Sequence, residues 1–206
     1  MKNVGHIPVT TLEGSQERVR QRILEKAFSR FGRYGFGKTT MAEISKDCEM
    51  SPGNLYRYFK SKKDIGADCA KRAMLQKLDL LRKIIDNENL SPNQKLHASA
   101  LEVLNYMHYQ FSDQPALMEL VDFISRERWA IVQKYAKQER LLISEILLQG
   151  NTSGDFNIPD VQETSKWIQA ALMKFFSPRS MDAFTLEELR KEAEGVINTL
   201  IKGLKS

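Results

Sequence analysis

Hydrophobic residues recur along this chain at intervals of three and four, the spacing that places them on one face of a helix. The first such stripe precedes residue 32 and comprises Val19, Ile23, Leu24, Ala27, Phe28 and Phe31. Later stripes and their boundaries predict helices over 40–48, 52–59, 61–86, 92–111, 115–125, from there to 149, 159–176 and 185–204. No segment alternates apolar and polar residues as a strand would, so the pattern predicts an all-α protein.

Polar residues at the expected helix starts support these elements. Thr40 is followed three residues later by Glu43, the spacing of a capping box in which each side chain bonds the other residue's backbone amide. Comparable starts occur at Ser51–Pro52, Ser61–Asp64, Ser91–Gln94 and Thr185–Glu188. Turn-forming residues predict helix ends at Gly32 and before Pro178, and a loop over 150–156.

Two short helices lie close together between residues 40 and 59. Only Cys48, Glu49 and Met50 separate them, which requires a sharp crossing angle and is typical of a helix-turn-helix. The second helix directs Leu55 and Phe59 inward, so its opposite face carries glycine, amide, aromatic and basic side chains. Such a face suits the major groove of DNA, where Asn54 and Arg57 can reach base edges and lysines can neutralise phosphates.

Residues 18–65 resemble the DNA-binding domain of TetR-type transcriptional regulators. The matching residues are Ala27 to Phe31, Tyr34-Gly35-Phe36, Thr39-Thr40, Ile44, Ser51, Gly53, Leu55-Tyr56, Tyr58-Phe59-Lys60-Ser61-Lys62 and Ile65. With the basic residues of this segment, the resemblance implies the following DNA-contacting residues: Lys38, Thr39 or Thr40, Ser51, Pro52, Gly53, Asn54, Tyr56, Arg57, Tyr58, Lys60 and Lys62. One position departs from the family, which usually has glycine where Glu49 stands in the turn. A left-handed conformation there would strain Glu49.

The charge distribution agrees with a DNA-binding N-terminal region. Residues 1–80 hold 16 Lys and Arg against 9 Asp and Glu, whereas residues 81–206 hold 15 against 17. The net charge of +5 therefore originates in the N-terminal part, as an electrostatic footprint for DNA requires. The two cysteines provide no disulfide framework and the N-terminus has no signal-peptide core, so we expect a cytoplasmic protein with no membrane association.

Other chemistry finds little support. Residues 32–39 read GRYGFGKT and formally satisfy the P-loop pattern, but an amphipathic helix precedes them where a P-loop needs a buried strand. His6, His97 and His108 lack metal-ligand spacing, and no nucleophile elbow or dinucleotide motif occurs. We therefore expect no metal, no cofactor and no enzymatic activity.

The helices after residue 63 predict a second domain, for which the resemblance implies effector binding and dimerisation. Aromatic residues and flexible thioethers suggest a pocket for an apolar or aromatic effector. The pocket candidates are Met107, His108, Phe111, Met118, Phe123, Trp129, Trp167, Met173 and Phe176. Small and large apolar residues on the helices at 159–176 and 185–204 suit a four-helix dimer interface. The interface candidates are Trp167, Ala170, Ala171, Lys174, Leu189, Ala193, Val196, Ile197 and Leu200.

These observations predict three parts, a flexible arm over 1–16, a helix-turn-helix domain over 17–62 and a ligand-binding and dimerisation domain over 63–206. The predicted function is that of a homodimeric repressor, released from a palindromic operator by a small hydrophobic or aromatic effector. A ligand-independent activator or nucleoid-associated factor remains an alternative, as does an all-α small-molecule carrier. The sequence names neither the operator nor the effector.

Overall fold

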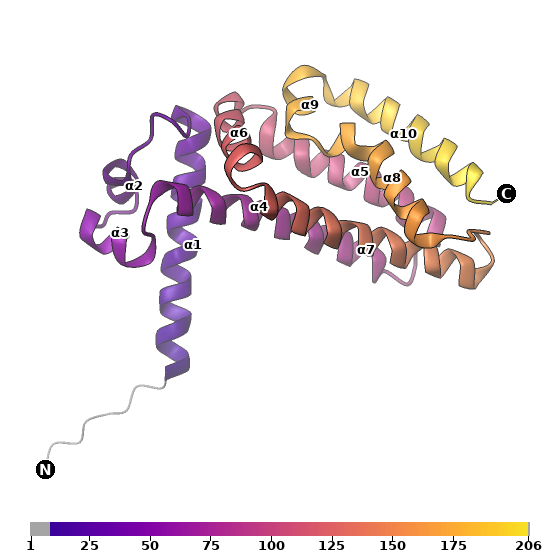
Figure 1. The fold of residues 1–206 in the computed structure, drawn as a ribbon, viewed down its shortest axis with the longest axis horizontal. Coiled ribbons are helices and arrows are strands. Elements are labelled where there is room, and N and C mark those ends of the chain that lie inside the picture. The colour runs from indigo at the N-terminus through magenta and orange to yellow at the C-terminus, as the bar shows by residue number, and fades with distance from the viewer. Residues whose placement is uncertain (1–8, 206) are drawn as a thin grey trace, which may run out of the picture.

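The computed structural model describes residues 9–205, and within this range it contains helices and no strand. Figure 1 shows them in chain order. They are α1 (Val9–Tyr34), α2 (Met41–Asp47), α3 (Pro52–Tyr58), α4 (Lys62–Ile85), α5 (Pro92–Phe111), η1 (Pro115–Leu117), α6 (Met118–Glu127), α7 (Trp129–Ser153), α8 (Val161–Phe176), α9 (Pro178–Ala183) and α10 (Leu186–Gly203). The all-α prediction is confirmed.

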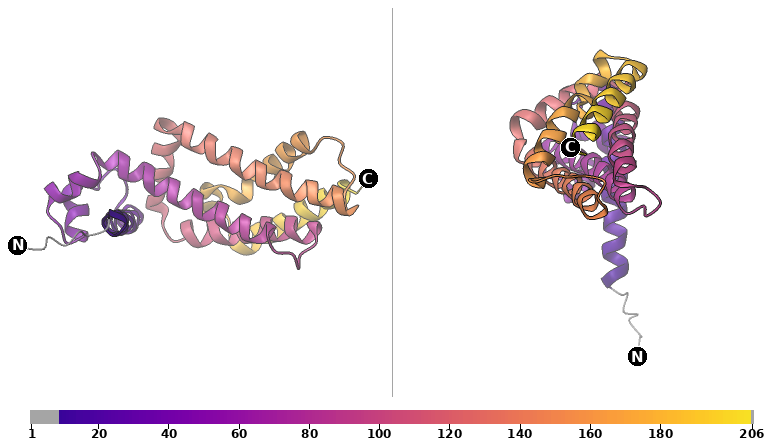
Figure 2. Two further views of the ribbon diagram at one scale, coloured as in Figure 1. Left: turned by 90° about the horizontal axis from the view of Figure 1, so that it is seen from below. Right: turned by 90° about the vertical axis from the view of Figure 1, so that its right-hand side faces the viewer.

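Helices α1 to α3 form a small domain at one end of the molecule, and α4 runs from it along the larger C-terminal body (Figure 1). In the right-hand view of Figure 2, α1 projects from the body, and in the left-hand view α4 lies along it. The small domain encloses the fully buried Ile23, Phe31, Ile44 and Leu55, to which α4 adds Ile65. In the body, α5 packs on α4 and α10, and α7 packs on α4 and α8. Helix α4 therefore contributes to both hydrophobic cores.

The five helix caps predicted at Thr40, Ser51, Ser61, Ser91 and Thr185 are confirmed. Capping boxes form between Thr40 and Glu43, Ser91 and Gln94, and Thr185 and Glu188. Ser51 and Ser61 each accept a hydrogen bond from the backbone amide three residues ahead. Each bond satisfies an amide that the helix itself leaves without a partner.

Helix α1 is longer than the sequence predicts at both ends. Residues 9–16, expected in a flexible arm, belong to the helix, and residues 1–8 of that arm lie outside the described range. The predicted stop at Gly32 is wrong, because the helix continues to Tyr34 and ends at Gly35, which has a φ of +88°. Gly32 instead allows the Gln114 side chain to approach, since a Cβ there would lie 1.9 Å from Gln114 Oε1.

Three boundaries in the C-terminal body also differ from the prediction. Helix α7 extends through the expected loop to Ser153, since the Thr152 hydroxyl bonds the Leu148 carbonyl and Gly150 packs beneath the Phe156 ring. Helix α8 begins at Val161 and not at Pro159, because the Asp160 carboxylate caps it. The additional short helix α9 follows Ser177, with Pro178 at its first position.

The turn between α2 and α3 has the left-handed residue that the sequence suggested. Glu49 has a φ of +55°, the only positive φ of a non-glycine residue in the described chain. The Met50 amide donates to the Ser45 carbonyl and the Glu49 amide to the Lys46 carbonyl, both at 3.0 Å. This is the Schellman pattern, which normally places glycine at the left-handed position.

Replacing Glu49 by glycine should therefore stabilise the protein. We expect the free energy of unfolding of Glu49→Gly to be about 1 kcal/mol higher than that of Glu49→Ala, because alanine keeps the strain of the left-handed conformation. Both variants lose the exposed Arg22–Glu49 ion pair, so the comparison isolates the backbone effect. Chemical denaturation of the two variants measures the difference, and equal stabilities would show that Glu49 is unstrained.

Candidate DNA-binding surface and interior cavity

Helix α3 has one buried and one exposed face. Leu55 and Phe59 are buried, at 0% and 3% exposure, and belong to the hydrophobic core. The predicted DNA-contacting residues around them divide by exposure. Lys38, Thr40, Ser51, Pro52, Gly53, Tyr56, Arg57 and Lys60 are exposed, whereas Asn54, Tyr58 and Lys62 are half-buried. The exposed residues lie in the loop before α2, at its cap and along α3, and they include the basic Lys38, Arg57 and Lys60.

Gly53 has open space around it. A Cβ at this position would meet no atom within 4 Å, and its φ is not positive. The fold therefore does not require glycine here. A ligand approaching the α3 backbone closely would require it, as DNA phosphates do.

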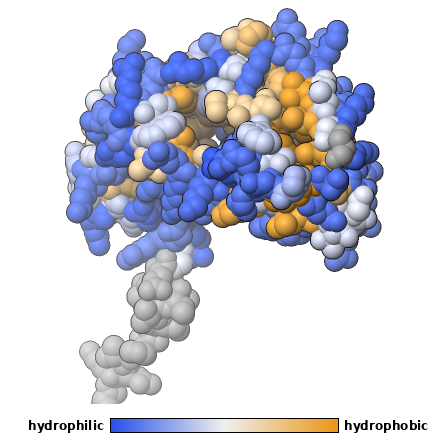
Figure 3. Space-filling model, turned by 45° about the vertical axis from the view of Figure 1, so that its right-hand side comes forward, coloured by the Kyte–Doolittle hydropathy of each residue, from blue (hydrophilic) through white to orange (hydrophobic). Residues whose placement is uncertain are grey.

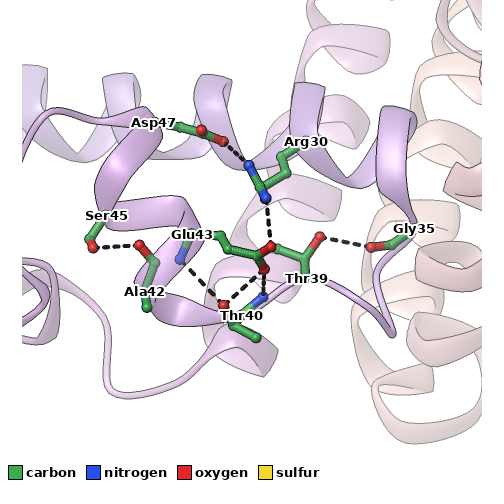
Figure 4. Close-up of polar contacts among 8 residues, drawn as sticks. All are labelled: Arg30, Gly35, Thr39, Thr40, Ala42, Glu43, Ser45 and Asp47. Atoms are coloured by element: carbon green, nitrogen blue, oxygen red, sulfur yellow. Dashed lines mark hydrogen bonds and ion pairs between the residues drawn. The ribbon is translucent and has the colours of Figure 1, made fainter.

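Thr39 does not belong to this surface. It is 2% exposed, and its hydroxyl donates to the Gly35 carbonyl at 2.8 Å, which closes the loop before α2 (Figure 4). Of the two threonines, Thr40 is the exposed one and caps α2. The prediction of Thr39 as a DNA contact is corrected, because its hydroxyl has a structural partner.

Arg30 of α1 holds α2 in place, a role that no sequence pattern indicates. Its guanidinium lies 2.8 Å from both the Glu43 and the Asp47 carboxylates, and its side chain is only 15% exposed (Figure 4). The hydrogen bonds from Thr40 lower the pKa of Glu43 below its usual value, and the interaction with Arg30 lowers this pKa further. The arginine thus links the cap of α2 to α1.

Arg20 plays the same part for α3. It donates to the Tyr58 carbonyl at 2.8 Å, pairs with Asp68 of α4 at 2.7 Å and stacks over the Phe59 ring. The last carbonyl of α3 is thereby bound to an α1 side chain that is itself paired with α4. The orientation of α3 is set by both helices.

Lys62 is directed inward. Its ammonium donates to the carbonyls of Phe36 at 2.6 Å and Gly37 at 2.9 Å, and partial burial lowers its pKa. Both acceptors belong to the loop between α1 and α2. In place of the predicted phosphate contact, we expect Lys62 to fasten this loop, because two of its three ammonium protons already bond backbone carbonyls.

Helix α6 of the body contacts the same loop. The Gly37 amide donates to Glu119 at 2.6 Å, and the Phe36 ring stacks on Phe123 with centroids 4.7 Å apart. Lys63 and Glu127 form an ion pair at 2.5 Å nearby. These contacts join the small domain to the body at a second point besides α4.

A cavity of about 230 Å³ lies behind this junction, between α4, α5 and α6. Phe28 of α1 lines it on one side, Ala73 and Met74 line it from α4, and Leu120 and Ile124 from α6. The walls of the cavity are thus the same elements that position the DNA-binding helices.

Three polar side chains line the cavity among the apolar ones, those of Tyr106, Lys77 and Ser125. The Tyr106 hydroxyl donates to the Ala73 carbonyl at 2.9 Å, and burial raises its pKa to about 12. Lys77 pairs with Glu139 at 2.5 Å, and both side chains are largely buried. Residues 9–205 contain no cluster of three His, Cys, Asp or Glu side chains that could hold a metal, and no helix among them is long and apolar enough to cross a membrane.

Comparison with known protein families decides the identity of this architecture. The family described as bacterial regulatory proteins of the tetR family matches residues 23–68, and the tetracycline repressor-like C-terminal domain matches residues 92–197. The protein belongs to the TetR family. It is a DNA-binding transcriptional regulator with the helix-turn-helix and C-terminal helical domains of that family.

Solved structures share this fold at low sequence identity. A tetR-family protein from Rhodococcus RHA1 is 20% identical, with 90% of this chain and 96% of that one covered at a TM-score of 0.64. A putative regulator from Pseudomonas aeruginosa PAO1 is 18% identical, with 91% and 92% covered at 0.71. The SmeT–triclosan complex is 16% identical, with 90% and 91% covered at 0.66. A comparison with curated proteins gives no match.

The cavity of this TetR-family protein contains only part of the predicted pocket. Met107, Phe111 and Phe176 line it. His108, Met118, Phe123, Trp129, Trp167 and Met173 do not line it. Trp129, Trp167 and Met173 are at least half exposed, and Phe123 stacks on Phe36. Residue type alone did not reveal which way these side chains point, and it missed Phe28, Lys77 and Tyr106.

The predicted dimer residues also separate into two groups. Leu189, Ala193 and Ile197 are fully buried within the subunit, where α10 packs on α5 and α8. They are therefore core residues, and their assignment to a dimer interface is corrected. Val196, Leu200 and Lys174 are half-buried, whereas Trp167, Ala170 and Ala171 on α8 are exposed. On the face shown in Figure 3, hydrophobic side chains reach the surface in patches.

Gly53→Ala should separate DNA binding from folding. Alanine has the higher helix propensity and meets no neighbour, so stability should hold or rise by up to about 1 kcal/mol. The added methyl group should weaken DNA binding by about tenfold if the α3 backbone approaches DNA closely. Denaturation and fluorescence anisotropy with a duplex measure the two effects, and unchanged affinity would remove Gly53 from the interface.

Lys60 and Lys62 should behave differently on substitution. Lys60→Ala should weaken binding to every DNA sequence and reduce the salt slope by about 1, because an exposed lysine can neutralise one phosphate. Lys62→Ala should leave the salt slope near the wild-type value and lower stability, because it loses two carbonyl contacts. DNA titrations at several salt concentrations test this, and the reverse pattern would restore Lys62 as the phosphate ligand.

Proposed function

We propose that this protein is a homodimeric repressor that binds a palindromic operator and leaves it when a small molecule occupies the interior cavity. One observation carries the proposal. The cavity is walled by α1, α4 and α6, the three helices that also hold the DNA-binding elements. A ligand that moves any of them would change the position of α3.

The proposed DNA contacts are the exposed and half-exposed residues of the small domain. They are Lys38, Thr40, Ser51, Pro52, Gly53, Asn54, Tyr56, Arg57, Tyr58 and Lys60. The α3 helix would lie in the major groove with Arg57 at a base edge. This role places the protein with the chromosome, in the cytoplasm. We assign residues 17–62 to DNA binding and residues 63–206 to ligand binding and dimerisation.

The dimer is supported by the outward face of α8. Trp167 and Met173 are 61% and 65% exposed there, beside the small Ala170 and Ala171. Large exposed hydrophobic side chains beside small ones allow two helices to approach closely. A two-fold dimer through this face would present two copies of α3 to a palindrome.

The effector mechanism follows from reciprocal coupling. A ligand that binds the DNA-free arrangement more tightly lowers DNA affinity by the same factor by which DNA lowers ligand affinity. The SmeT–triclosan complex shows a small molecule bound to a protein of this fold. Coupling of about 1–3 kcal/mol would correspond to a change of roughly 5–150-fold in operator affinity.

Selection of bound sequences from a random duplex pool tests the function. The proposal predicts a two-fold symmetric motif with half-sites about one helical turn apart, protected by a dimer. A matched duplex with one scrambled half-site should bind more weakly. Recovery of no preferred sequence, with equal and strongly salt-dependent binding to all duplexes, would favour the nucleoid-associated alternative.

A further inference from the structure

The cavity contains one charged residue among the side chains that the structure places in its wall, Lys77 of α4. Its ammonium lies 5.6 Å from the centroid of the Phe176 ring, which also lines the cavity. The Lys77 side chain is 16% exposed and that of its partner Glu139 is 6% exposed. Lys77 therefore lines the cavity with its charge paired to a largely buried carboxylate just outside the lining residues.

The pair leaves the cavity electrically balanced. One ammonium faces one carboxylate at 2.5 Å, so the formal charges cancel. A ligand carboxylate would add a second negative charge to a site with a single ammonium, and a ligand amine would add a second positive charge. Either excess charge is costly in a low-dielectric interior because no counter-charge in the wall offsets it.

The same pair leaves hydrogen-bond donors available. An ammonium has three protons, and within residues 9–205 the bond to Glu139 uses one of them. The Tyr106 hydroxyl proton already bonds the Ala73 carbonyl, so Tyr106 offers a ligand only acceptor capacity. The strongest unused polar group in the wall is thus a donor, and it favours a ligand with an acceptor oxygen.

The size of the cavity and its apolar wall further restrict the class of ligand. A volume of about 230 Å³ is below the roughly 300–1,000 Å³ typical of pockets for drug-sized ligands. We propose that the cavity binds a small, uncharged, mainly apolar molecule that carries a carbonyl or ether oxygen for Lys77. That this molecule is also the effector rests on the proposed function.

Four probes of similar shape test the ligand class on the full-length protein by calorimetry. They are 4-phenyl-2-butanone, butylbenzene, 3-phenylpropanoate and 3-phenylpropylamine. The ketone should bind about fivefold more tightly than butylbenzene, the factor expected of one net hydrogen bond. The carboxylate and the amine should each bind at least about tenfold more weakly than the ketone, because each leaves an excess charge.

Substitution of Glu139 gives the sharpest test. Glu139→Gln keeps the shape and an acceptor but leaves the Lys77 ammonium without a counter-charge. The affinity of this variant for 3-phenylpropanoate should therefore rise about tenfold or more, which makes the carboxylate its preferred probe. The double variant Lys77→Met with Glu139→Gln should bind the ketone and butylbenzene equally. Glu163→Gln removes an exposed pair with Lys166 on α8, and as the matched control it should change no probe affinity.

The outcomes separate this inference from the proposed function. Equal or tighter binding of 3-phenylpropanoate to the wild-type protein would overturn it, as would binding of none of the four probes. So would a Glu139→Gln protein that remains folded and shows no gain for the carboxylate. Ketone binding that leaves DNA affinity unchanged would support the ligand class and contradict the repressor mechanism.

Discussion

The position of the DNA-binding helices depends on the packing of one ring, Phe36. The ring meets Phe31 of α1 edge to face at 5.1 Å and stacks on Phe123 of α6. On α4, a Cβ at Gly66 would lie 2.7 Å from the Phe36 ring and 3.0 Å from Leu120, so only glycine fits there without a shift. Three helices from two domains therefore meet at a single side chain. Hydrogen bonds from Lys62 to the Phe36 carbonyl and from the Gly37 amide to Glu119 fix the peptide group that follows it.

This junction explains how a cavity in the body can concern DNA. Leu120 packs toward Gly66 and also lines the cavity, and Phe28 of α1 forms another part of the wall. Displacement of α6 by a bound molecule would alter the Phe36 contacts and the Glu119 bond together. Because packed interiors adopt discrete arrangements and do not deform continuously, such a displacement should shift α1 and α4 as units.

Local signals predicted most of the fold. The caps at Thr40, Ser51, Ser91 and Thr185 were recognisable because a capping bond spans only three residues. The left-handed Glu49 followed from the expected turn for the same reason. Gly32 and Gly150 were misread as helix ends because they make room for Gln114 and Phe156, which only the tertiary fold brings near.

The candidate sites were predictable only in part. An exposed face on α3 followed from the helical period once Leu55 and Phe59 were placed inward. Thr39 and Lys62 turned out to bind loop carbonyls, which no sequence spacing indicates. The apolar stripe of α10 is compatible with packing inside the subunit and with packing against a second subunit, and the sequence does not distinguish the two. In the structure, Leu189 and Ile197 pack within the subunit. The sequence thus predicted that these helices exist, but it did not predict in which direction their side chains point.

Because Phe36 joins them, we expect the small domain and the body to unfold as one cooperative unit, and native-state hydrogen exchange can measure this. The experiment compares the opening free energy of buried amides at Ile23 and Phe31 in α1 with that at Leu96 and Leu104 in α5. Both sets should open at the same free energy and respond equally to denaturant. Opening of α1 to α3 at a clearly lower free energy, while α5 stays protected, would contradict it.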